Sequence, residues 1–349
     1  MPDRLSLPVG IVGAGLAGLA AAHALGAAGV ASVVIEKSRG VGGRAATRWR
    51  DESGVRWRVD HGAQVFTPAA GSAADRLARS VTEPVEIAGR VVPFSADGLL
   101  RPADARTDGP PRLAFRNGYA TLARALADAT PGLDLRLSTT ATALDRADDG
   151  TWTVAGTDAD GRDVRLGPFR AVVLTPPAPQ AAALAPFADV AQALAETTYR
   201  SQFAVVLAFS APVGLPGGAY ALVNAPADGH AVAWLADESR KPNRAPDGAG
   251  LLVAQMSDAW TRAHYDADPA DVVARASEHA EALAGPLPPT LWTDTQRWRY
   301  SLPDAGADTA RAGEARGLYV AGDAVAGQGR THLAMETGLD AAARLLGAG

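Results

Sequence analysis

A glycine-rich turn between an apolar strand and a helix, near the start of the chain, most constrains the fold. The apolar stretch Val9–Val12 leads into Gly13-Ala14-Gly15-Leu16-Ala17-Gly18, and a helix-prone segment rich in Ala and Leu follows. In a GxGxxG turn the first glycine permits the tight bend, the second lets the backbone approach a pyrophosphate, and the third allows the helix to pack closely on the sheet. The helix N-terminus also offers unpaired N–H groups to phosphates. The spacing predicts a βαβ unit that binds a dinucleotide.

A second apolar stretch, Ser32–Ile35, ends at Glu36 and predicts the next strand of this unit. A carboxylate there accepts hydrogen bonds from ribose hydroxyls and repels a 2′-phosphate, so the site should not hold NADP. Gly42-Gly43-Arg44 follows, and an arginine suits a phosphate because its charge is permanent and its donors are fork-shaped. Together these motifs point to FAD. A strand–turn–helix without a ligand, and a surface position for Arg44, are the competing interpretations.

Residues 9–35 are also apolar enough to suggest a signal peptide or a membrane span. We expect neither, because glycines and His23 interrupt the run, and no basic segment with a cleavage site precedes a compact apolar core. A cytoplasmic location is the expectation.

Length and composition narrow the remaining possibilities. The chain has 349 residues, which predicts two domains, and it contains no cysteine. Without cysteine there is no disulfide, thiolate metal site, dithiol redox pair or cysteinyl flavin bond, so FAD should be held non-covalently. The six histidines show no metal-ligand spacing such as HExxH, and we expect no metal. The net charge of −5 and the lack of a basic stripe argue against a nucleic-acid partner.

The order of apolar stretches predicts an α/β fold of two interleaved domains. A Rossmann-like FAD-binding domain is assigned residues 1–68, 112–185 and 296–349. A second, α+β domain for the substrate is assigned residues 69–111 and 186–295, and is expected to be built on a mixed or antiparallel sheet. The strands expected in that sheet are residues 203–209, 230–235 and 250–256.

Periodicity and turn signals predict further elements along the chain. They are a hairpin at 45–59, helices at 72–81, 117–127, 270–284 and 333–346, short strands within 85–93, a strand at 133–144 pairing with 151–155, strands at 171–175 and 317–321, and an extended segment at 291–300. Residues 97–112, rich in Pro, Asp and Gly, predict a surface excursion.

These motifs, with Gly322-Asp323 near the end of the chain, resemble the FAD-dependent amine oxidase superfamily. Within it the chain is most similar to the renalase-like proteins, and to their bacterial members in particular. That narrower similarity depends on Asp60–Thr67, on Trp234 followed by Lys241–Arg244, and on Gln296–Pro303. It covers nearly the whole chain, and it implies an FAD-binding domain of the p-hydroxybenzoate-hydroxylase type.

The resemblance assigns roles to individual cofactor contacts. Glu36 is expected at the adenosine ribose, Arg44 at a phosphate, the strand of Ala141 at the adenine, and Asp323 at a ribityl hydroxyl. The helix starting near Leu333 is expected to aim its N–H groups at the flavin C2 carbonyl, where negative charge collects on reduction. Alone, Asp323 could equally be a helix N-cap or a turn former. The complete set of expected contacts is Gly13, Ala14, Gly15, Leu16, Ala17, Gly18, Glu36, Lys37, Gly42, Gly43, Arg44, Gly62, Ala63, Gln64, Ala141, Gly322, Asp323 and Leu333.

The substrate side is less well defined by the sequence. No residue is assigned as catalytic, and the candidates near the flavin or the substrate are Gln64, Phe66, Trp234, Trp298, Tyr300 and His332. For Trp234, Trp298 and Tyr300 the alternative is an ordinary position in the core or at the domain interface. For His332 and His61 the alternative is a structural hydrogen bond. The family pattern has an aromatic residue where this chain has Val65, so the pocket wall is expected to differ. Lys241 is expected to be exposed in a polar loop, with a ligand role left open.

The resemblance implies an oxidase that takes a hydride from a small planar donor to flavin N5. The implied reaction is oxidation of off-pathway dihydronicotinamide isomers to ordinary NAD(P)+, with O2 as the acceptor and hydrogen peroxide as the product. Many amine oxidases of the superfamily carry a lysine in a substrate-domain strand, and the corresponding stretch here, Tyr199–Phe209, has none. An amine oxidase or desaturase on the same scaffold, and a flavin-binding protein without turnover, are the alternatives.

Overall fold

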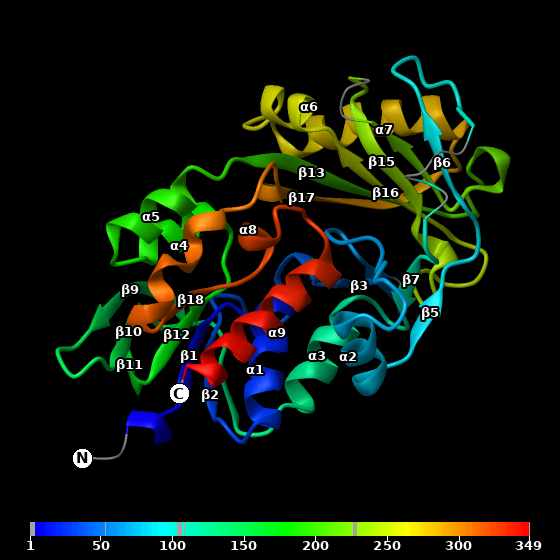
Figure 1. Ribbon diagram of the computed structural model, residues 1–349. Helices are drawn as coiled ribbons and strands as arrows, with labels where there is room; N and C mark the ends of the chain where they lie inside the picture. Colours follow the sequence, from blue (N-terminus) through cyan, green and yellow to red (C-terminus); the bar gives the residue numbers. More distant parts are fainter. Residues whose placement is uncertain (1–3, 53, 103–106, 108, 226–228, 349) are drawn as a thin grey trace.

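The computed structural model describes residues 4–52, 54–102, 107, 109–225 and 229–348 (Figure 1). Two large sheets organise these residues, one carrying helices α1, α3 and α9, the other carrying α6 and α7. Of the helices in the described ranges, none combines the length and the apolar character needed to cross a bilayer. Part of the surface excursion expected at 97–112 lies outside the described residues.

The first sheet is parallel and forms the centre of the nucleotide-binding unit. Its strands, in spatial order, are β18 (Leu318–Val320), β12 (Ala171–Leu174), β1 (Val9–Val12), β2 (Ser32–Ile35) and β8 (Leu133–Arg136). Every residue of β1 is buried, as expected for a strand covered on both faces. Helix α1 (Leu16–Ala27) connects β1 to β2, so the predicted βαβ unit is confirmed.

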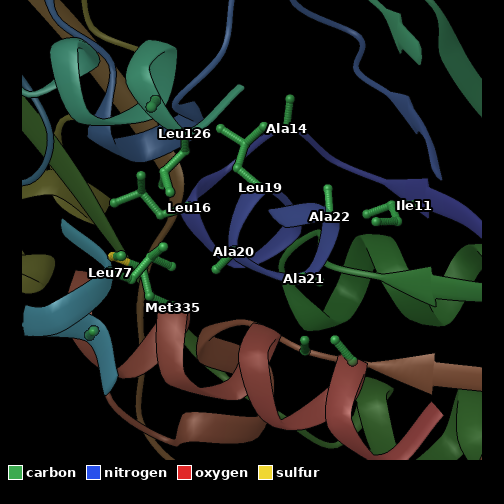
Figure 2. Packing of buried hydrophobic residues seen from close by; sticks show 14 of the residues in the cluster. Ile11, Ala14, Leu16, Leu19, Ala20, Ala21, Ala22, Leu77, Leu126 and Met335 are labelled. Carbon is green, nitrogen blue, oxygen red and sulfur yellow. The ribbon is translucent and has the colours of Figure 1, made fainter. Parts of the chain in front are cut away.

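Helices cover one face of this sheet. Helix α1 packs against α9 (Thr331–Gly347), and α2 (Ala73–Val81) and α3 (Ala120–Asp128) complete the layer. Figure 2 shows Leu77 of α2 and Met335 of α9 in the cluster around Leu16 of α1. The two long helices can approach closely because Gly338 has no side chain. A Cβ at this position would overlap the carbonyl oxygen of Ala17.

The opposite face is covered by a three-stranded sheet of β9 (Thr140–Arg146), β10 (Trp152–Thr157) and β11 (Asp163–Phe169), and by helices α4 (Ala178–Leu184) and α5 (Ala188–Ala195). The prediction of one strand over 133–144 is wrong, because β8 and β9 belong to different sheets. The chain turns between them at Ser138, whose φ is +51°. Ser138 and Thr139 donate backbone hydrogen bonds to the carbonyls of Ser38 and Glu36, which carries the chain past the end of β2.

The second sheet is mixed, as predicted. In spatial order its strands are β17 (Thr290–Pro303), β13 (Tyr199–Phe209), β16 (Gly250–Met256), β15 (Val232–Asp237), β14 (Ala221–Asn224) and β6 (Val91–Phe94). All neighbours are antiparallel except β14 and β6. Helices α6 (Asp258–Ala263) and α7 (Pro269–Ala284) lie over one face, which is apolar. The hairpin of β3 (Arg48–Glu52) and β4 (Val55–Val59) packs on the other.

The expected strands 203–209, 230–235 and 250–256 do share this sheet, and the expected helices at 72–81 and 270–284 are confirmed. The sequence did not predict α4, α5, β11 or β14. The domain boundaries stay a prediction, and two observations bear on them. Helix α2 packs in the apolar cluster of α1 and α9, and β17 runs as one strand across residue 296. The remaining elements are β5 (Pro84–Glu86), β7 (Leu113–Phe115), α8 (Asp323–Ala326) and short 3-10 turns at Arg4–Ser6, Gly43–Ala45, Pro216–Gly218, Glu238–Arg240 and Asp308–Arg316.

Candidate functional site

The glycine-rich turn has the geometry that phosphate binding requires. Gly13 has φ +106°, and a Cβ at Gly18 would overlap the Gly13 carbonyl oxygen, so both positions need glycine. At Gly15, by contrast, an added Cβ would meet nothing within 4 Å. Gly15 is the N-cap of α1 and offers no side-chain cap, so the helix N-terminus faces open space. Ala14, Leu16 and Ala17, also expected at the cofactor, are buried around it.

Gly42 lies directly beside this turn. Its N–H donates to the carbonyl of Ala14 at 2.8 Å, and it forms an isolated parallel bridge with Gly15. Its φ is +109°, and that of Gly43 is +55°. The Gly-Gly pair therefore brings a second stretch of bare backbone to the same open space, where a side chain would obstruct a pyrophosphate.

Glu36 directly follows β2, at the expected ribose position, and is only 7% exposed. Its two carboxylate oxygens accept hydrogen bonds from the backbone N–H groups of Ala14 and Ser38, both at 2.8 Å. A carboxylate offers about four acceptor positions, so two remain for ribose hydroxyls. Thr139 donates its N–H to the Glu36 carbonyl, which places Ala141 and the start of β9 near the C-terminal end of β2. Lys37, also expected at the cofactor, is exposed.

The structure joins Arg44 and Asp323, which were expected to bind different parts of the cofactor. Asp323 Oδ1 accepts a hydrogen bond from Arg44 Nη2 at 2.7 Å and one from the Tyr199 hydroxyl at 3.2 Å. Burial lowers the pKa of Arg44, but the charge of Asp323 and its hydrogen bonds more than offset this and raise that pKa above its usual value. Gly322, with φ +102°, turns the chain into α8 just before Asp323. Arg44 thus belongs to the site, with 29% of its side chain exposed.

The loop after β4 passes directly over Arg44. Ala63 donates its N–H to the Arg44 carbonyl at 2.9 Å, and a Cβ at Gly62 would overlap that carbonyl. The carbonyl of Gly62 accepts a hydrogen bond from the Gln255 side chain at 2.6 Å. The expected contacts Gly62, Ala63 and Gln64 therefore lie between the nucleotide unit and the second sheet.

Helix α9 begins at Thr331, two residues before the expected start near Leu333, and lacks a side-chain cap. His332 Nδ1 is buried and has no hydrogen-bond partner in the described part of the chain. Burial lowers the pKa of His332, so its ring is neutral at pH 7. Phe66 lies 6.4 Å from that ring, centroid to centroid, and is itself fully buried against Phe115.

One face of the second sheet presents amide and indole side chains toward this loop. Gln202 is paired with Trp298, and Ala204 is paired with Gln255, which is paired with Trp234. Directly opposed residues of antiparallel strands share a face, so these five residues form one surface, which we name the Gln–Trp face. Gln202, Trp234, Gln255 and Trp298 are all partly exposed, and no member is charged. Trp234 Nε1 has no hydrogen-bond partner among the described residues.

Trp298 connects this face to the loop. Its Nε1 donates to the His61 carbonyl at 3.0 Å, and its ring stacks on the His61 imidazole with centroids 5.3 Å apart. Tyr300 behaves differently. Its ring packs edge-on against Tyr199 and against the apolar cluster beneath β12, away from the Gln–Trp face.

The expectation that Lys241 is exposed is wrong. Lys241 is 1% exposed, and with Asp60, Glu238 and Arg244 it forms a buried cluster of two cations and two anions, which we name the ion quartet. Burial would raise the pKa of Asp60, but the charges of Arg244 and Lys241 hold it at about 2. Glu238, Lys241 and Arg244 are close together in the chain, but Asp60 lies far from them in the sequence, so no local pattern indicates the cluster.

Comparison with known proteins identifies the family. Residues 87–346 match the flavin containing amine oxidoreductase family, and residues 11–81 match an NAD(P)-binding Rossmann-like domain. The chain belongs to the flavin-containing amine oxidoreductase family. FAD is its cofactor. The pyrophosphate of FAD fits the open space at Gly15 and the uncapped N-terminus of α1, and its ribose fits the remaining acceptor positions of Glu36.

Solved structures agree on the fold along the whole chain. Wild-type putrescine oxidase bound to putrescine is 17% identical, with a TM-score of 0.75 and coverage of 99% of this chain and 100% of the other. Cyclohexylamine oxidase from Brevibacterium oxydans IH-35A is 16% identical, with a TM-score of 0.72 and coverage of 98% and 99%. Reduced UDP-galactopyranose mutase is 13% identical, with a TM-score of 0.75 and coverage of 99% and 96%. At these identities the similarity shows the fold alone.

Proposed function

We propose that this enzyme oxidises a small planar hydride donor, a dihydronicotinamide isomer of NAD(P)H, in the manner of the renalase-like proteins. When bound, FAD would supply the redox chemistry: the donor would lose two electrons and one proton as a hydride, and O2, with one further proton from water, would leave as hydrogen peroxide. The protein's task is then to hold a flat donor against the flavin and to exclude competing substrates.

The composition of the Gln–Trp face carries this proposal. Indole rings such as those of Trp234 and Trp298 stack on flat rings, and glutamine amides such as those of Gln202 and Gln255 match the donor and acceptor of a carboxamide. Ala204, at the centre of the face, has the smallest side chain of the five and is buried beneath the larger ones. A dihydronicotinamide loses a hydride without first losing a proton, so a face without an acid or a base suits this donor.

Amine oxidation on the same scaffold is the second candidate, favoured by the family and by the presence of amine oxidases among the similar structures. An amine must lose its ammonium proton before it loses a hydride. The carboxylate of Asp294, which lies further along β17 on the same side as Trp298, is paired with Arg48 and so is not free to bind that cation. Strand β13 has no lysine, and Lys241 is committed to the ion quartet. These observations favour the uncharged planar donor.

The test is an anaerobic titration of the FAD-loaded protein, followed by the visible flavin absorbance. Dihydronicotinamide isomers should bleach the flavin quickly, at a rate that changes little with pH, and admission of O2 should restore the colour and produce hydrogen peroxide. Putrescine and cyclohexylamine should leave the colour unchanged. Bleaching by amines at a rate that rises steeply with pH would replace the proposal with amine oxidation, and a flavin that no donor reduces would indicate a binding protein.

Paired tryptophan variants locate the donor. Trp234→Leu should raise the donor concentration needed for half-maximal bleaching while leaving the flavin spectrum unchanged. Trp260→Leu is the matched control, because Trp260 lies on α6, packs on Phe203, and faces the opposite side of the same sheet. Equal effects of the two substitutions would show that the donor does not bind on the Gln–Trp face.

A further inference from the structure

We propose that the ion quartet is a positioning device for the loop at the flavin site, and that Lys241 acts on this loop through the side chain of Gln64. This inference requires only that the protein binds FAD, and it holds whichever donor the enzyme oxidises.

The quartet is a closed arrangement of four buried charges. Lys241 Nζ lies 2.6 Å from Glu238 Oε2 and 3.4 Å from Asp60 Oδ2. Arg244 completes it, with Nη2 2.7 Å from Asp60 Oδ2 and Nε 3.1 Å from Glu238 Oε1. No side chain of the four is more than 1% exposed. The charges balance, so the cluster is neutral as a whole.

The members of the quartet come from both sides of the site. Glu238, Lys241 and Arg244 follow β15 of the second sheet, whereas Asp60 follows β4 and opens the loop. Asp60 Oδ1 is held in turn by the backbone N–H of Tyr119 at 2.9 Å and the hydroxyl of Thr47 at 2.7 Å. The quartet therefore fastens the start of the loop to α3 and to the second sheet together.

Gln64 receives its orientation from this cluster. Lys241 Nζ contacts Gln64 Oε1 at 3.4 Å, and Gln64 Nε2 donates to the Asp60 carbonyl. With one end of the amide facing a cation and the other facing a carbonyl, only one orientation of the amide satisfies both contacts. Gln64 adjoins Ala63, which is hydrogen-bonded to Arg44, so its position sets the backbone that passes over the nucleotide site.

Stability alone does not account for four buried charges. Replacing a buried ion pair by apolar residues of similar volume is often neutral or stabilising, because removing charges from water is costly. Charges and hydrogen bonds impose direction, which apolar contacts do not. A quartet whose lysine reaches Gln64 supplies that direction where the loop meets the cofactor.

The decisive variant is the double substitution Lys241→Met with Glu238→Gln, which removes one charge of each sign and keeps the side-chain volumes. Asp60 and Arg244 remain paired in it. Measured on the FAD-loaded protein, we expect a changed visible circular dichroism of the flavin and FAD affinity weakened roughly 5- to 30-fold. Gln64→Leu should give the same changes. The triple variant should be no worse than the double, since residues that act through one another are not additive.

Two results would overturn the proposal. One is a double variant with a lowered melting temperature but a wild-type flavin spectrum and FAD affinity, which would make the quartet merely structural. The other is a triple variant whose loss of FAD affinity equals the sum of the separate losses. If the double variant does not fold, Gln64→Glu decides the question, because it replaces the amide N–H that donates to the Asp60 carbonyl with a carboxylate oxygen that cannot donate. It should change the flavin spectrum as Gln64→Leu does, and a wild-type spectrum in both variants would refute the positioning role of Gln64.

Discussion

His61 makes the stability of the protein depend on pH in a range where few other groups titrate. The side chain is 6% exposed, stacks on Trp298, and has an Nδ1 without a partner in the described residues. Burial, assisted by the positive charge of Arg48, lowers the pKa of His61 from 6.5 to about 4. The unfolded chain binds a proton near pH 6.5 and the folded chain only near pH 4, so the unfolded state gains protons first. Stability therefore falls as the pH falls from 6.5 toward 4.

The size of the effect follows from the shift. Each pKa unit corresponds to about 1.4 kcal/mol, so the full contribution is about 3 kcal/mol, of which about 2 kcal/mol is lost between pH 7 and pH 5. We expect His61→Asn to remove this loss. The measurement is urea unfolding of the FAD-saturated protein at pH 7 and pH 5, for the wild type and the variant. Other histidines titrate equally in both, so the difference between the two pH dependences isolates His61. Identical pH dependences would refute the assignment of a buried, neutral His61.

Further predictions concern the glycine turn and the ion quartet. Gly18→Ala should lower the free energy of unfolding by about 1–3 kcal/mol, because the new Cβ overlaps the Gly13 carbonyl. Gly15→Val should leave the melting temperature near that of the wild type, because its side chain enters open space. The same side chain should weaken FAD binding, measured by flavin fluorescence. A similar loss of stability in both variants would contradict this distinction. Asp60→Asn should lower the melting temperature at pH 7, and the difference from the wild type should shrink as the pH falls from 4 to 2, because the folded-state pKa of Asp60 is depressed to about 2. A constant difference over that range would show that its pairing with Arg244 is not what stabilises the fold.

The features that the sequence predicted well are those specified locally. The strand Val9–Val12, the turn and the helix after it follow from apolar runs and glycine spacing within a few residues of one another. The second sheet was foreseen for the same reason, since its strands are separately apolar. The prediction failed over 133–144, where an apparent single alternation hides the turn at Ser138. That turn is made by contacts with Ser38 and Glu36, which no local pattern reveals.

The site divides along the same line. The glycine-rich backbone of the candidate FAD site could be predicted because the spacing of its glycines is visible in the sequence. The burial of Lys241 could not, because a lysine in a segment rich in Pro, Asn and Arg has the composition of a solvated loop. Glu238 is near Lys241 in the sequence, but only the fold adds the carboxylate of Asp60, so that two anions offset the two buried cations.

The interleaved topology explains why both charged contacts at this site join distant parts of the chain. Arg44 in the first fifty residues pairs with Asp323 near the end, and Asp60 pairs with cations that follow β15. The first pair requires the segment after β18 to be in place, and the second requires the segment after β15. Closing the long loops between these residues costs more conformational entropy than forming the glycine turn, whose residues are close together in the chain. The complete cofactor site is then a property of the finished fold, and the charged residues, rather than the glycines, are the groups that report its completion.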